Sequence, residues 1–189
     1  AYTFEDKFYF VSARNQTRKT YGWNKEPALD LFVAENTSGV LSKPKEVEGD
    51  INTNFHEGTL AVSNDGTTIY FTRNDYLNGK YRKDEDGINH LKIYKASLVN
   101  GQFQDIQDLS INDVSYSNAN PALSPDNSQL YFSSDRPGGY GASDLYVVDI
   151  QEDGSLGEPK NLGGTINTEA RENFPFVDED QILYFSSDG

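Results

Sequence analysis

The sequence of 189 residues contains no cysteine and no methionine. Without cysteine the chain can form no disulfide, and it offers neither a reactive thiol nor a cysteine ligand for zinc. The chain also opens on AYTFEDKFYF, which is not a basic and apolar leader. We therefore expect the translation start and any signal peptide to lie outside these residues.

Basic residues are scarce relative to acidic ones. The chain has 16 Lys and Arg against 30 Asp and Glu, a formal net charge of -14. Such a charge repels nucleic-acid phosphates, so no nucleic acid is expected among the partners. Long apolar runs are also absent: stretches such as 31–34 fall far short of the roughly 20 residues that a membrane-spanning helix needs. We expect no membrane insertion by this chain.

Recognisable catalytic and metal-binding motifs are missing as well. The two histidines, His56 and His90, lie in separate polar segments, and the sequence shows no nucleophile elbow, phosphate-binding loop or zinc signature. No catalytic residue, metal site or cofactor is predicted, and the chain is not expected to be an enzyme. The carboxylates clustered at 84–86 and 178–180 allow two interpretations, calcium-binding turns or solvated turns, and the second is favoured.

What the sequence does contain is an internal repeat. A pair of aromatic residues closes an alternating run four times, at spacings of 61, 61 and 53 residues. After each of the first three pairs come an aliphatic–aromatic pair, a Gly-x-Leu or Gly-x-Phe turn and an Ile-Asn dipeptide, always in this order. We call these four features, in chain order, the first to fourth markers. The aromatic pairs are Tyr9-Phe10, Tyr70-Phe71, Tyr131-Phe132 and Tyr184-Phe185, and the dipeptides are Ile51-Asn52, Ile111-Asn112 and Ile166-Asn167.

Each repeat is predicted to form four short strands. Alternating β-branched and aromatic residues, as in 67–72 and 129–133, are bounded by Gly, Asn, Asp and Pro, and no long window keeps a helical period. Four strands per repeat are typical of a blade of a β-propeller, so we predict an all-β propeller of antiparallel blades, with an open sandwich as the alternative. The blade-like repeats are placed at about 1–62, 63–123 and 124–177, followed by the start of another blade at 178–189.

The stretch from Pro121 to Gly189, which contains SPDNSQLYFSSDRPGGYGASDLYVV, resembles the WD-repeat-like periplasmic propellers of the TolB type. More narrowly, it is similar to the version found in OmpA-family, outer-membrane-associated proteins, some of which are envelope components of the type IX secretion system. The resemblance is weaker over 1–120, where VSARNQT and TRNDYLN replace SSDRPGG. It implies a six-bladed ring, a periplasmic location at the outer membrane, and envelope or secretion-system proteins as partners. Because three blades cannot close a ring, we expect further blades in the parent protein.

Two repeats carry long insertions between the first and second markers. Phe10 to Leu31 spans 21 positions and Phe71 to Ile93 spans 22, whereas the third repeat has only 13. Equivalent loops of neighbouring blades emerge on the same face, and their Arg, Tyr and Trp residues are typical of interface hot spots. With the short third loop included, the predicted partner-binding residues are Arg14, Arg18, Lys19, Tyr21, Trp23, Arg73, Tyr76, Lys80, Tyr81, Arg82, Lys83, Arg136 and Tyr140.

Other interpretations of these residues stay open at this point. The two insertions can be solvated loops without a ligand, and Arg136 can pair with a carboxylate of a neighbouring blade. The leading functional hypothesis is a non-enzymatic protein-interaction scaffold of the Gram-negative cell envelope. The alternative is a carbohydrate-binding or carbohydrate-active propeller, a hydrolase or lyase, that acts on an anionic glycan.

Charge reversal tests the basic loops. Exchanging Arg18, Lys19, Arg82 and Lys83 for Glu is expected to weaken partner binding without lowering the thermal midpoint, because solvated loop residues contribute little to stability. Unchanged binding of the variant would contradict a basic binding surface.

Overall fold

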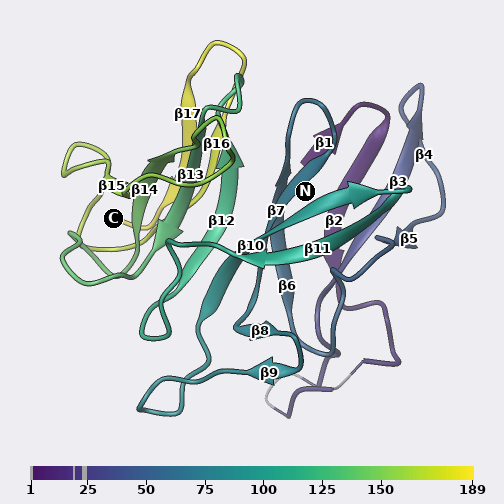
Figure 1. Ribbon diagram of the computed structural model, residues 1–189, viewed down its shortest axis with the longest axis horizontal. Coiled ribbons are helices and arrows are strands. Elements are labelled where there is room, and N and C mark those ends of the chain that lie inside the picture. The colour runs from purple at the N-terminus through teal and green to yellow at the C-terminus, as the bar shows by residue number, and fades with distance from the viewer. Residues whose placement is uncertain (1, 19, 23–24) are drawn as a thin grey trace.

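The computed structural model describes residues 2–18, 20–22 and 25–189, and within them it contains strands but no helix. These residues accordingly offer no helix that could cross a membrane. Figure 1 shows antiparallel sheets standing side by side in chain order, from the purple N-terminal sheet to the yellow C-terminal hairpin. This is the predicted all-β architecture of propeller blades.

We call the four sheets the first to fourth blades. The first contains β1 (Tyr2–Phe4), β2 (Lys7–Ser12), β3 (Asp30–Thr37), β4 (Val40–Leu41) and β5 (Lys45–Glu46). The second contains β6 (Glu57–Val62), β7 (Thr68–Asn74), β10 (Leu91–Val99) and β11 (Gln102–Asp108). The third contains β12 (Asn118–Leu123), β13 (Gln129–Ser134), β14 (Asp144–Asp149) and β15 (Lys160–Asn161), and the fourth contains β16 (Glu172–Val177) and β17 (Leu183–Ser187). A small separate hairpin joins β8 (Tyr76–Leu77) to β9 (Lys80–Tyr81).

The sheets begin one strand earlier than the repeats counted from the sequence. Residues 57–62, which the predicted boundaries group with the first repeat, form β6 and pair with β7 of the second blade. The same shift applies to β12 and β16. The reason is the tight turn that follows each of these strands. At two of these turns the carboxylates of Asp65 and Asp126 accept hydrogen bonds from the residues on both sides. Each turn therefore joins the strand to the next one as a hairpin within the same sheet.

The paired aromatics of the first marker serve two different interfaces. Successive residues of a strand point to opposite faces of the sheet. Tyr9 of the first blade therefore packs in one core with Phe71 of the second blade. Tyr70, the neighbour of Phe71, packs in a second core with Phe132 of the third blade. The first and second blades thus present their Tyr to the blade that follows, and the second and third blades present their Phe to the blade that precedes them.

The Asn of each Ile-Asn marker binds the backbone of a third strand. The Oδ1 atom of Asn52 accepts the N–H of Leu31 at 2.7 Å, and its Nδ2 donates to the carbonyl of Leu31 at 3.0 Å. Asn112 makes the same two bonds to Ile93, and Asn167 makes them to Leu145. A primary amide can replace a peptide group in a β ladder because it presents one donor and one acceptor side by side. The marker therefore joins each connection between blades to the blade it leaves.

Removal of one such amide should destabilise the chain. We expect Asn52→Ala to lower the free energy of unfolding by about 2 kcal/mol, because two backbone groups near the core lose a partner at about 1 kcal/mol each. Urea unfolding followed by circular dichroism measures the change. The exposed Asn54, two residues away, provides the control, since Asn54→Ala should leave the midpoint unchanged. Equal stability of the two variants would contradict this role of the marker.

Candidate functional site: an aromatic surface formed by two insertions

The two long insertions meet at one end of the blades, as expected for equivalent loops. The ring of Tyr21, from the β2–β3 connection, lies 4.4 Å from the ring of His56. Phe55 lies between Tyr76 and Tyr81 of the β8–β9 hairpin, at centroid distances of 4.8 and 4.4 Å. We call these five residues the aromatic surface. The segment that carries Phe55 and His56 links the first and second blades, so three separate parts of the chain build it.

The β8–β9 hairpin is a preorganised part of this surface. Asn78 and Gly79 form its tip with φ values of 51° and 80°, the combination that a tight two-residue hairpin turn requires. At its base the amide of Asn89 donates to the carbonyls of Asp75 and Arg82. The hairpin projects from the end of the second blade (Figure 1) and leaves Tyr81 41% exposed. A large and rigid ring is therefore available to a partner at low entropic cost.

Arg18 and Arg82 were predicted as partner-binding residues, and the structure places each against a buried carboxylate. Arg18 Nε lies 2.8 Å from Asp30, which is fully buried, and Arg82 Nε lies 2.6 Å from Asp75, which is 2% exposed. Arg82 also pairs with Asp108. Both cations neutralise charges of the fold, so the expectation that their reversal leaves the thermal midpoint unchanged is corrected.

Three further arginines of the predicted set stack on aromatic rings. Each guanidinium covers a ring of the second strand and the ring that pairs with it on the third strand. The residues are Arg14 over Phe10 and Phe32, Arg73 over Phe71 and Tyr94, and Arg136 over Phe132 and Tyr146, at 4.5–5.4 Å from the ring centroids. Arg73 is only 2% exposed and cannot contact a partner, which corrects that prediction. Arg136 has a structural role, as one interpretation held, but it binds rings, Asn118 and the carbonyl of Ile111, not a carboxylate.

The remaining predicted residues divide into three groups. Lys80 and Lys83 are exposed and have no ion-pair partner among the residues that the structure describes. Tyr140 is 57% exposed, but it belongs to the third blade and packs over Gly164, outside the aromatic surface. Lys19 and Trp23 lie outside the described residues. The basic surface expected from the sequence is thus mostly an aromatic one.

A buried carboxyl, Glu57, lies beside the aromatic surface and has no counterpart among the predicted residues. It is fully buried, and its Oε2 atom and the Nε atom of Arg73 have no hydrogen-bond partner in the described part of the chain. Burial raises the pKa of Glu57 from near 4.5 to about 8, although a hydrogen bond from Thr53 and the charge of Arg73 act in the opposite direction. Burial, Tyr81 and Glu57 together raise the pKa of Tyr21, which places the carboxyl close to the surface.

The sequence does carry a signal for this carboxyl. The pattern Asn-Thr-x-x-x-Glu occurs at 52–57 and again at 167–172. In both copies the Thr hydroxyl donates to the Glu at 2.7 Å. Glu172 has further donors in Ser187 and Thr168, which lower its pKa despite the opposing effect of burial. Glu172 is paired across the strands with Ser187, whose hydroxyl donates to it. Glu57 is paired with Arg73 at the equivalent position and therefore lacks this hydroxyl donor.

His90 connects the second insertion to the third blade. Its Nε2 lies 2.8 Å from Asp84 and its Nδ1 lies 3.2 Å from the hydroxyl of Ser117, which also accepts the N–H of Leu91. Asp84 accepts a second bond, from the N–H of Ile88, as a turn residue does. These contacts anchor the loop. Within the described ranges no group of three or more His, Cys, Asp or Glu side chains is placed to hold a metal ion.

Comparisons with known proteins place the fold and leave the activity open. No family model matches the chain, and no curated protein matches it. Among solved structures it is similar to TolB from Acinetobacter baumannii (TM-score 0.52, 16% identity, 95% of this chain and 34% of that one). It is also similar to a puromycin hydrolase (0.56, 13%, 98% and 35%) and to the gluconolactonase XC5397 from Xanthomonas campestris (0.51, 18%, 84% and 52%).

These similarities confirm the TolB-like propeller fold. The chain spans about a third to a half of the length of these structures. At 13–18% identity the likeness concerns the fold alone, and the proteins that share it include both TolB and enzymes.

Reversal of one arginine should destabilise the chain. We expect Arg82→Glu to lower the free energy of unfolding by at least about 1 kcal/mol, because Asp75 loses its cation; the partial exposure of Arg82 keeps the effect below the ~3–5 kcal/mol of fully buried pairs. Thermal unfolding measures the change. Lys83→Glu, the adjacent exposed residue, is the control and should leave the midpoint unchanged. An equal response of both variants would show that the Arg82–Asp75 pair is unimportant.

Glu57 should make stability depend on pH. The pKa of Glu57 is higher in the folded chain, about 8, than in the unfolded chain, about 4.5. Its contribution to the free energy of unfolding is therefore fully present below pH 4.5 and is lost as pH rises through about 8. We therefore expect Glu57→Gln, which cannot ionise, to become more stable relative to the natural chain as pH rises from 4.5 to 8. Urea midpoints at several pH values test this. A difference between the two chains that stays constant with pH would contradict it.

Proposed function

We propose that this chain is a protein-binding scaffold and that the aromatic surface is its contact region. The observation that carries the proposal is the convergence of Tyr21, Phe55, His56, Tyr76 and Tyr81 from three separate segments. Clustered, rigid aromatic rings are the typical anchors of protein interfaces. The hairpin that carries two of them is fixed by Arg82 and Asn89, so little order has to be gained on binding.

We place this scaffold in the Gram-negative cell envelope. The resemblance of residues 121–189 to OmpA-family propellers supports this assignment, and so does the fold likeness to TolB. On this proposal the chain works at the periplasmic side of the outer membrane, and its partners are envelope or type IX secretion proteins. The proposal assigns no chemistry to the chain.

Glycan binding is the second candidate. One observation favours it: the ring of Tyr81 is stacked on Phe55 with an interplanar angle of 25° and remains 41% exposed, an arrangement on which a sugar face can lie. An enzyme acting on an anionic glycan would in addition need paired carboxylates or a histidine within a cleft. Glu57 is buried and unavailable for this role, and His90 is engaged on both ring nitrogens.

Binding of envelope components by matched variants tests the proposal. The immobilised chain, Tyr81→Ala and Tyr140→Ala are exposed to envelope extract and separately to envelope polysaccharide, and the retained material is identified by mass spectrometry. We expect Tyr81→Ala to lose one defined envelope protein by about ten-fold, the size of an interface anchor worth about 1.4 kcal/mol. Tyr140→Ala removes an even more exposed ring outside the surface and should retain it.

The other outcomes decide between the candidates. Retention of polysaccharide alone, lost with Tyr81→Ala, would replace protein binding by glycan binding. Equal retention by all three chains would overturn the assignment of the aromatic surface.

A further inference from the structure

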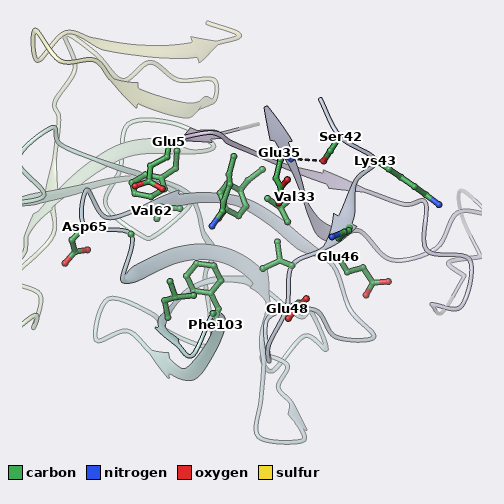
Figure 2. Close-up of a pocket in the computed structure, with 18 residues that line it drawn as sticks. Glu5, Val33, Glu35, Ser42, Lys43, Glu46, Glu48, Val62, Asp65 and Phe103 are labelled. Atoms are coloured by element: carbon green, nitrogen blue, oxygen red, sulfur yellow. Dashed lines mark hydrogen bonds between the residues drawn. The ribbon is translucent and has the colours of Figure 1, made fainter. Parts of the chain in front are cut away.

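A groove of about 510 Å³ lies at the opposite end of the first and second blades. It lies among the turns at 5–6, 65–66 and 99–101, which join the strand ends that point away from the two insertions. Figure 2 shows Val33 and Phe103 toward the middle of the groove, with Glu5, Val62 and Asp65 toward one end and Glu46 toward the other. Its volume falls within the range of about 300–1,000 Å³ that is typical of ligand sites.

The groove exists because the outer edge of the first blade is interrupted. β4 and β5 both pair with β3, and Ser42 still exchanges hydrogen bonds with Glu35 of β3, but residues 43–44 leave the edge. The wall beyond β5 is then fixed to the second blade, since the N–H of Phe103 donates to Glu48 and its carbonyl accepts the N–H of Asp50. Gly49 allows this approach, because a Cβ atom there would overlap the carbonyl oxygen of Phe103. The groove is therefore a fixed part of the interface between two blades.

The floor of the groove is apolar. Tyr9, Val47 and Phe103 are each 5% exposed, and Val62 is 1% exposed; all belong to the core between the first and second blades. An apolar side chain placed on this floor would be removed from water against side chains that are already ordered. Each buried methylene group would contribute about 0.8 kcal/mol.

The rim carries charges of both signs that the fold does not use. Lys7, Lys45, Glu5, Glu35 and Glu48 line the groove and are exposed. None has an ion-pair partner within the part of the chain that the structure describes, in contrast to Arg18, Arg82 and Lys160. Such a rim suits a ligand that is itself charged at both ends and apolar between them.

We propose that this groove binds a short peptide with free ends and an apolar side chain. The side chain lies on the floor formed by Val47, Val62 and Phe103. The terminal ammonium group lies toward Glu5, and the terminal carboxylate accepts charge-assisted hydrogen bonds from Lys7 and Lys45. This site is separate from the aromatic surface, and the proposal does not depend on the function proposed for that surface.

Titration of the whole ¹⁵N-labelled chain with two tripeptides tests the site. The first is Ala-Leu-Ala with free ends, and the second is acetyl-Ala-Leu-Ala-amide, which has the same apolar side chain and no end charges. We expect saturable NMR shifts at the amides of Val33, Val47 and Phe103 with a Kd of about 1 mM or below. The capped peptide should bind at least about five-fold more weakly because it lacks both charged contacts.

Two double variants supply the control. Lys7→Ala combined with Lys45→Ala should weaken Ala-Leu-Ala binding about five-fold, whereas Lys80→Ala combined with Lys83→Ala, at the other end of the blades, should not change it. All four lysines are exposed, so neither variant should fail to fold. Equal binding of the capped peptide, shifts confined to other parts of the chain, equal affinity of the two variants, or no shift at about 5 mM peptide would each overturn the proposal.

Discussion

The packing of one blade's Tyr face against the next blade's Phe face is the contact on which the rest of this structure depends. Tyr9 with Phe71, and Tyr70 with Phe132, lie in the two cores that run between the three complete sheets. This packing fixes the separation of neighbouring sheets. The connection that leaves each of these blades is held to the blade's third strand by a single Asn amide, as Asn112 binds Ile93. These contacts position the loops at both ends of the blades, and those loops form the aromatic surface at one end and the groove at the other.

The use of the arginines follows from the same cores. A guanidinium is planar and weakly hydrated, so it can cover two rings at the end of an interface while its N–H groups donate to a backbone carbonyl. Arg73 and Arg136 do this in successive blades, donating to Ile51 and Ile111. Arg18 and Arg82 neutralise Asp30 and Asp75, which the fold has buried. Most of the basic residues expected at a binding surface therefore make contacts within the fold, and the function proposed for that end depends on aromatic rings.

The two ends of the first and second blades suit different ligands. At one end, two insertions extend the surface outward, and its rings offer area without a deep cavity. At the other end, a missing stretch of outer strand leaves an apolar recess with unpaired charges around it. A flat aromatic surface suits a macromolecule, whereas a recess suits a small ligand that can be largely enclosed. Beside the aromatic surface, the buried Glu57 has a pKa raised by burial to about 8.

The sequence by itself determined the fold class, the four-stranded sheets of the second and third blades and the end at which the long loops emerge. These follow from local rules: side-chain alternation in strands, turn residues at hairpins and a marker order that never changes. The sheet boundaries, the partners of the arginines, the raised pKa of Glu57 and the groove were decided only by the tertiary structure. The physical reason is that a residue type fixes which interactions are possible, while burial and the distance to groups far along the chain decide which of them form. The sequence alone already shows that Arg82 is positively charged, but only the folded chain brings Asp108 within 2.8 Å of it.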